Sequence, residues 1–372
     1  MTARRPFMAG LAACAATAVI RPSLVLARRS DLFSLGIASG EATSDGIVLW
    51  TRLAPRPFDP DGGMSAGHVE VTWQVAANER FRRLVQSGTA VAKREQAHTI
   101  HVKVDGLRPD HEYFYRFLAL GEASPTGRTR TLPEAGERLA KLRFAVAGCQ
   151  RYEDGFFTPY RHMAKRDMAF VFHYGDYIYE SECEPGRVRS FDLAEAFTLE
   201  DYRLRYALYK SDPDLQTAHA ACAFIHSYDD HEVVNNWSGD WHPQIGALSE
   251  FRQRRAAALQ AFYEHMPLRP RSRPRNGRMQ MHRRFRIGDL VDLYVPDTRR
   301  FRTPTPCADD FVIGERCQEA YRSDAEMAGP QAGAVAVPQD GTLQCPLDGA
   351  GPTGADHGPR AAGKDGRRSA QA

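Results

Sequence analysis

Apolar and polar residues alternate along the first third of the chain, as is typical of half-buried β-strands. The clearest alternation covers residues 47–52, 69–75 and 113–117, and turn-forming residues separate these segments. Several short strands joined by regular turns favour an antiparallel β-sandwich. We therefore predict a small all-β domain over residues 31–135.

The pattern changes after residue 139, where apolar runs alternate with segments of helical periodicity. The runs predict strands at 143–148, 168–174 and 222–227, helices at about 157–166, 199–209 and 248–265, and a hairpin at 285–295. Alternation of this kind implies a sheet covered by helices. We predict an α/β domain over residues 140–326.

The two ends of the chain follow neither pattern. Residues 327–372 are rich in Gly, Ala and Pro and contain no aromatic residue, so we predict that they are disordered. At the other end, Arg4 and Arg5 precede a short Ala-rich apolar stretch. Residues 1–27 thus resemble a twin-arginine signal peptide. A chance Arg pair before an Ala-rich helix is the alternative.

These end segments predict where the protein acts. The apolar stretch is shorter than the roughly 20 residues that a transmembrane helix needs, so we expect no stable membrane anchor. A twin-arginine signal implies the twin-arginine export machinery as a partner and a periplasmic or secreted protein.

Composition narrows the function classes. The chain has 372 residues, enough for two domains, and a net charge of +3, which gives no support to a nucleic-acid partner. Its seven Cys include no CxxC pair, so a zinc-finger or thioredoxin-like site has no support. Cys307 and Cys317 could form a disulfide in an oxidising compartment.

Two acidic clusters follow two of the predicted strands. The sequence GDYIYE occupies residues 175–180 after the strand at 168–174, and YDDHE occupies residues 228–232 after the strand at 222–227. Carboxylates at the carboxyl ends of strands face the crevice where open α/β sheets bind ligands. Two such clusters, one with a His, are what metal-assisted hydrolysis of phosphoesters needs.

Four segments, in order, resemble the PhoD-type alkaline phosphatases, which are metallophosphoesterases related to purple acid phosphatases. They are FAVAGCQ at 144–150, YEDG at 152–155, GDYIYE at 175–180 and DDHEVVNN at 229–236. The resemblance extends from about Phe33 to about Arg322. It implies an α/β metallophosphoesterase-like layered sheet preceded by a fibronectin type III-like or immunoglobulin-like domain, phosphate ester substrates, and ferric iron and calcium as cofactors.

The resemblance also implies metal ligands. Asp176 would bridge two ions, Cys149 and Tyr179 would bind ferric iron, and Asp230 would bind the second metal, with Asn235 a further oxygen ligand. Each has a structural alternative, because Asp favours helix N-caps and a buried Cys often acts only as a small apolar residue.

Three residues are candidates for catalysis. His231 could donate to a phosphoryl oxygen or protonate the leaving group. Arg254 or Arg255, on the predicted helix at 248–265, could hold the phosphate through a bidentate fork. A loop His with structural hydrogen bonds and a solvated basic helix face are the alternatives.

The resemblance stops before a Gly-Asp-Val-His-type metal motif that the family carries further on. We therefore expect the layered sheet to be incomplete and interpret residues 327–372 as the result of a frameshift or truncation. Two functions follow. One is an exported alkaline phosphatase or phosphodiesterase that uses a hydroxide held by its metals and is impaired by truncation. The other is a non-catalytic secreted fragment that keeps half a metal site.

Overall fold

The computed structural model describes residues 31–65, 67–242, 245–304, 321 and 323–327. The predicted signal peptide, the Cys307–Cys317 disulfide and nearly all of the predicted tail lie outside these residues. Within the described residues, no helix is both long and apolar enough to cross a membrane.

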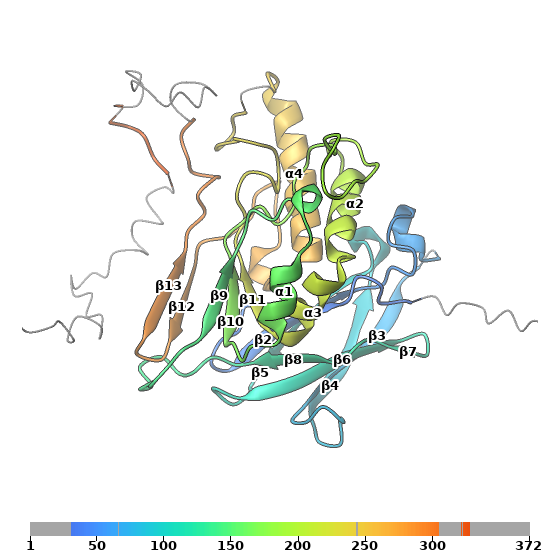
Figure 1. Cartoon of the computed structure of the whole chain (residues 1–372), viewed down its shortest axis with the longest axis vertical. Helices are drawn as coiled ribbons and strands as arrows, with labels where there is room; N and C mark the ends of the chain where they lie inside the picture. Colours follow the sequence, from blue (N-terminus) through green and yellow to red (C-terminus); the bar gives the residue numbers. More distant parts are fainter. Residues whose placement is uncertain (1–30, 66, 243–244, 305–320, 322, 328–372) are drawn as a thin grey trace, which may run out of the picture.

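A six-stranded sheet in the order β5-β2-β1-β11-β10-β9 forms the centre of the molecule. Its strands are β1 (Ile37–Gly40), β2 (Gly46–Arg52), β5 (Thr99–Asp105), β9 (Phe144–Ala147), β10 (Phe170–His173) and β11 (Ala223–His226). The last three are mutually parallel, and β1 pairs with β11 in parallel. One sheet therefore runs from the first predicted domain into the second (Figure 1).

A second, antiparallel sheet belongs to the N-terminal region alone. It consists of β3 (Val69–Ala76), β4 (Leu84–Ala92), β6 (Glu112–Ala119), β7 (Glu122–Ala123) and β8 (Gly127–Arg130). Val71 and Phe117 of this sheet share a core with Leu49 and Ile100 of the first sheet. The two sheets thus face each other as predicted, but one of them continues into the α/β region. A self-contained fibronectin type III-like or immunoglobulin-like domain is therefore not confirmed.

Helices cover one face of the α/β part of the sheet (Figure 1). They are α1 (Thr158–Ala164), α2 (Leu199–Lys210), α3 (Pro213–Ala221) and α4 (Leu248–His265). The sequence pattern missed α3, a short helix capped by Asp212 and opened by Pro213. Val171 and Phe224 point from the strands into the core beneath the helices.

The hairpin of β12 (Arg283–Ile287) and β13 (Val291–Val295) covers the other face. Its Phe285 and Ile287 share a core with Phe170 and Ile225, the strand neighbours of the residues that face the helices. Since successive side chains of a strand point to opposite faces, this alternation produces the layers. The α/β layered architecture predicted for this region is confirmed. Single-turn 3₁₀ helices occur at Pro60–Gly63, Arg94–Gln96, Tyr152–Asp154 and Pro270–Ser272.

Candidate metal centre

The candidate site lies at the carboxyl ends of the three parallel strands. Cys149 follows β9, Asp176 follows β10, and Asp230 and His231 follow β11. Because parallel strands end at one edge of the sheet, the three loops meet there.

Tight backbone turns bring these loops together. Cys149 and Asp176 both have left-handed backbones, with φ of 50° and 51°. The Cys149 amide donates to the Gly175 carbonyl at 3.1 Å, and the Gln150 amide donates to the Asp176 carbonyl at 3.1 Å. A Cβ at Gly175 would lie 2.5 Å from the Asp229 amide nitrogen, so only glycine allows the loops to approach this closely.

The Asp176 carboxylate is the point on which the other groups converge. Its Oδ2 accepts from the Tyr179 hydroxyl at 3.2 Å and lies 3.3 Å from the Cys149 sulfur. Its Oδ1 accepts from the His231 amide at 3.3 Å. Ligand atoms of Asp176, Asp230 and His231 lie within 4.8 Å of one another. The structure thus brings together five of the residues that the sequence singled out.

Desolvation and mutual repulsion disfavour the charged forms of these donors. Burial, followed by the nearby Asp230 carboxylate, raises the pKa of Asp176. Partial burial and the Asp176 charge raise the pKa of the Cys149 thiol to about 11, and the same two causes raise the pKa of Tyr179. A bound cation would relieve all three shifts, because it favours the charged form of each donor. The donor set therefore fits a metal ion.

Glu180, the last residue of the GDYIYE segment, holds the His231 ring. Its Nδ1 lies 2.7 Å from Glu180 Oε2, and its ring stacks on Tyr179 with 4.1 Å between centroids. Burial alone would lower the pKa of His231, but the hydrogen bond and charge of Glu180, with Asp176 and Asp230 beyond, raise it to about 9. The arrangement leaves Nε2 as the ring nitrogen available to a ligand.

Comparisons with known proteins identify the family. The model of the PhoD-like phosphatase family matches residues 144–333, and the model of the PhoD-like phosphatase N-terminal domain matches residues 18–133. The chain belongs to the PhoD-like phosphatase family. The family resemblance that the four motifs suggested is thereby confirmed.

Individual relatives agree with this assignment. Alkaline phosphatase D of Bacillus subtilis (strain 168) is 48% identical over 275 residues, which are 73% of this chain and 47% of the relative. A solved structure of PhoD is 44% identical with a TM-score of 0.78, over 82% of this chain and 59% of that one. A purple acid phosphatase from yellow lupin (Lupinus luteus) seeds matches over 61% of this chain and 39% of that one with 15% identity and a TM-score of 0.36, and this likeness adds nothing to the assignment. The chain spans about half the length of the curated relative that it matches.

Two acidic side chains of the PhoD-like motifs have structural tasks that the sequence did not reveal. Glu232 is fully buried and accepts backbone N–H bonds from Asp176 at 3.1 Å, Tyr177 at 2.7 Å and Asp229 at 2.8 Å. Burial and the Asp176 charge raise the pKa of Glu232 to about 8. Glu180 holds His231 and also accepts from the Asn235 amide at 2.7 Å. These two residues fasten the loops after β10 and β11 to each other.

Arg299 enters the site from a distant part of the chain. Its guanidinium group lies 2.5 Å from Asp229 Oδ1 and 3.0 Å from Asp230 Oδ1. Asp297 holds the Arg299 amide at 3.2 Å, within an Asp-Thr-Arg segment. A cation against two carboxylates offsets part of the negative charge of the cluster.

The structure places the two predicted catalytic arginines elsewhere. Arg254 donates to the Tyr202 hydroxyl at 3.0 Å and to Glu195 at 2.7 Å. Arg255 donates to the Gly239 carbonyl and lies 2.7 Å from Asp240. Both are buried, so the solvated-face alternative is wrong, and no contact among the described residues joins either of them to Asp176. Helix α4 therefore commits both side chains to structural partners.

Asn235 lies at the margin of the cluster. Its residue is exposed, and its backbone makes the contacts: the amide donates to Glu180, and the carbonyl lies 3.0 Å from His242 Nε2. Its backbone is thus fixed next to the site, while its side chain stays open to solvent.

Proposed function

We propose that this chain carries the catalytic metal centre of a phosphoric ester hydrolase of the alkaline phosphatase type. The observation that carries the proposal is the convergence of a thiol, a phenol, a second carboxylate and an imidazole-bearing loop around Asp176. Cys149 remains exposed, so the centre opens to solvent and is accessible to a substrate. Family membership supports the same reaction class.

The donors divide between two kinds of metal. Cys149 and Tyr179 would hold a ferric ion together with Asp176, which would bridge to a second ion. Asp230 would bind that second ion, calcium, with Asn235 as a further oxygen ligand. When bound, the metals would polarise the phosphoryl group and lower the pKa of the attacking water.

The side chains around the metals have roles of their own. Glu180 orients His231 through Nδ1, so Nε2 is positioned to pass a proton to the leaving oxygen. Arg299 steadies Asp229 and Asp230 and offsets their charge. Arg254 and Arg255, which pair with Glu195 and Asp240, take no part in holding the phosphate.

The experiment compares wild type with Asp176→Asn, after iron and calcium are supplied. We expect metal-dependent hydrolysis of p-nitrophenyl phosphate or bis(p-nitrophenyl) phosphate by wild type, and loss of bound metal and turnover in the variant. Asp192→Asn, an identical charge change at an exposed position, is the matched control and should behave as wild type. Equal metal content in all three proteins would contradict the assignment of Asp176.

A second function rests on one observation. The chain spans 47% of the Bacillus subtilis relative, so ligands supplied elsewhere in that protein have no counterpart in the match. A non-catalytic secreted protein that keeps half a metal site is the alternative. Weak metal binding through Asp176 without turnover of either ester would support this alternative against the first.

We also propose export by the twin-arginine route to the periplasm or the medium. The proposal rests on the Arg pair and the apolar stretch of residues 1–27. Replacing Arg4 and Arg5 by Lys should retain the precursor in the cytoplasm, as a fractionation blot would show. Unchanged secretion would contradict the proposal.

A further inference from the structure

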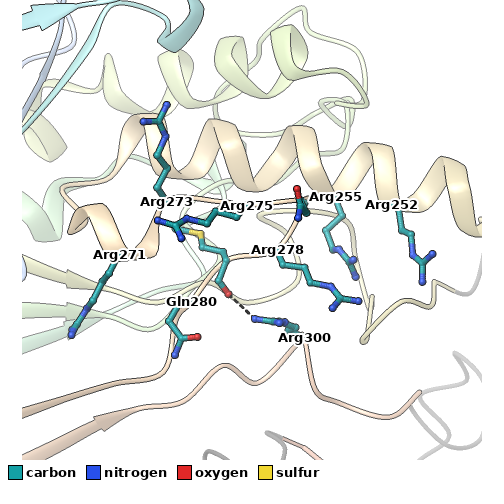
Figure 2. A pocket seen from close by; sticks show the side chains of 11 residues that line it. Arg252, Arg255, Arg271, Arg273, Arg275, Arg278, Gln280 and Arg300 are labelled. Carbon is teal, nitrogen blue, oxygen red and sulfur yellow. Dashed lines mark hydrogen bonds between the residues drawn. The ribbon is translucent and has the colours of Figure 1, made fainter.

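Arginine side chains line a pocket outside the metal centre. It has a volume of about 680 Å³ and lies between α4 and the loop at 268–281 (Figure 2). Its lining includes seven arginines, Arg252, Arg255, Arg271, Arg273, Arg275, Arg278 and Arg300. We call this hollow the arginine pocket.

The sequence builds one wall of the pocket as a stiff loop. Pro270 and Pro274 alternate with arginines in the run PRSRPRNGR, and each proline fixes its own φ. Asn276-Gly277 then makes a tight turn with φ of 50° and 67°, closed by Arg275 and Arg278 amide–carbonyl bonds of 2.8 and 3.0 Å. The arginines therefore project from a backbone that two prolines and a tight turn hold in place.

The charges of the pocket are not balanced. Asp240 lies 2.5 Å from Arg252, 2.7 Å from Arg255 and 4.0 Å from Arg278. The hydrogen bond from Arg252 lowers the pKa of Asp240, so this carboxylate stays ionised. Arg271, Arg273 and Arg275 have no carboxylate partner among the described residues. Among the described residues, one carboxylate thus contacts three of the seven guanidinium groups.

Other arginines of the same segment show that this imbalance is local. Arg269 and Arg283 flank the loop, and both pair with the buried Glu41. The loop therefore pairs its outer arginines with a carboxylate in the core and leaves the inner ones at the pocket. Repulsion among the inner group is relieved when an anion binds.

The guanidinium groups are spread over the pocket. Figure 2 shows Arg255, Arg278 and Arg300 turned toward a common space, while Arg271 and Arg273 point away from it on opposite sides. Arg300 is steadied by a 3.1 Å bond to the Met279 carbonyl. A single phosphate would reach only part of this array, whereas a chain of phosphoryl groups could meet several forks at once.

We propose that the arginine pocket binds an oligophosphate, a linear anion of three or more phosphoryl groups. The volume suits a ligand of this size. The pocket lies next to the metal centre and shares none of its donor residues: Arg299 faces the acidic cluster, and the next residue, Arg300, lines the pocket. The inference does not depend on the proposed hydrolase function, because it concerns binding by arginines that the metal centre does not use.

The test is calorimetric titration of the metal-free full-length chain with inorganic tripolyphosphate. Arg278→Gln with Arg300→Gln should weaken binding about tenfold or more, since hydrogen bonds between charged groups are lost. Arg82→Gln with Arg83→Gln removes the same charge from exposed positions of the N-terminal region and should leave the affinity unchanged. Orthophosphate should bind wild type more weakly than tripolyphosphate.

Three outcomes would overturn the proposal. An equal loss in the Arg82/Arg83 variant would show binding to net charge alone. A loss in Asp176→Asn would place the anion at the metal centre. Absence of binding to wild type would reject the pocket outright. If the Arg278/Arg300 variant fails to fold, as judged by circular dichroism, Arg278→Gln alone, at an exposed position turned toward the common space, replaces it and should also weaken binding.

Discussion

The metal centre and the arginine pocket are two charged sites of opposite sign in neighbouring parts of the molecule. In the centre, carboxylates at strand ends are buried, and backbone amides, His231 and Arg299 hold them in place. In the pocket, arginines project from a surface loop and share one carboxylate, Asp240. The metal centre therefore holds its donors in place for a cation, at a high cost of desolvation. The arginine pocket presents solvent-exposed guanidinium groups to an anion from solution. The two sites thus differ in how far their charged groups are buried, and this difference in burial determines which kind of ion each site can bind.

The largest effect should follow removal of the carboxylate that ties the loops of the metal centre. Glu232→Ala leaves two buried amides and one partly buried amide without an acceptor, so we expect it to lower the free energy of unfolding by about 3 kcal/mol and to abolish metal binding. Urea unfolding and elemental analysis measure the two effects. Glu79→Ala, an exposed position, is the control. A variant as stable as wild type would show that Glu232 is not the tie between these loops.

A buried lysine that has no carboxylate partner within the described part of the chain can be compared with the exposed arginines. Lys210 is buried, its ammonium lies 4.1 Å from the centre of the Trp50 ring, and burial lowers its pKa to about 7. Since the unfolded chain holds this proton up to about pH 10.4, Lys210 destabilises the fold increasingly as pH falls from about 10 to 7, and equally at lower pH.

Replacing Lys210 by Met should therefore stabilise the protein by a few kcal/mol near pH 7, and the gain should vanish above about pH 10. Thermal unfolding of both proteins across this range measures the difference. A gain that does not change with pH would assign the effect to packing. Lys103→Met, an exposed lysine of β5, should show no comparable trend, because its charge stays in water in both states.

The smallest effect should distinguish two neighbouring arginines. Arg299→Gln removes the cation that faces Asp229 and Asp230, so we expect turnover to fall about tenfold while tripolyphosphate binding is retained. Arg300→Gln should do the reverse, with weaker tripolyphosphate binding and unchanged turnover. Each variant is the control for the other. Equal losses in both assays would show that the metal centre and the arginine pocket act as one site.

The sequence by itself determined the local parts of this protein. Apolar runs and helical periodicity located the strands that became β9, β10 and β11, and the acidic motifs after them located Asp176 and Asp230. These features depend on neighbours within a few residues, because the period of apolar positions and the residues that end a strand are both local properties.

The tertiary structure decided which distant groups meet. The pairing of β1 with β11 joined two predicted domains into one sheet, and no local pattern records a partner so far along the chain. The same holds for Arg299, which reaches Asp229 from another segment, and for Arg254, which α4 turns toward Tyr202. Sheet order and helix packing bury these groups together, and the cost of leaving a buried charge unpaired then selects their partners.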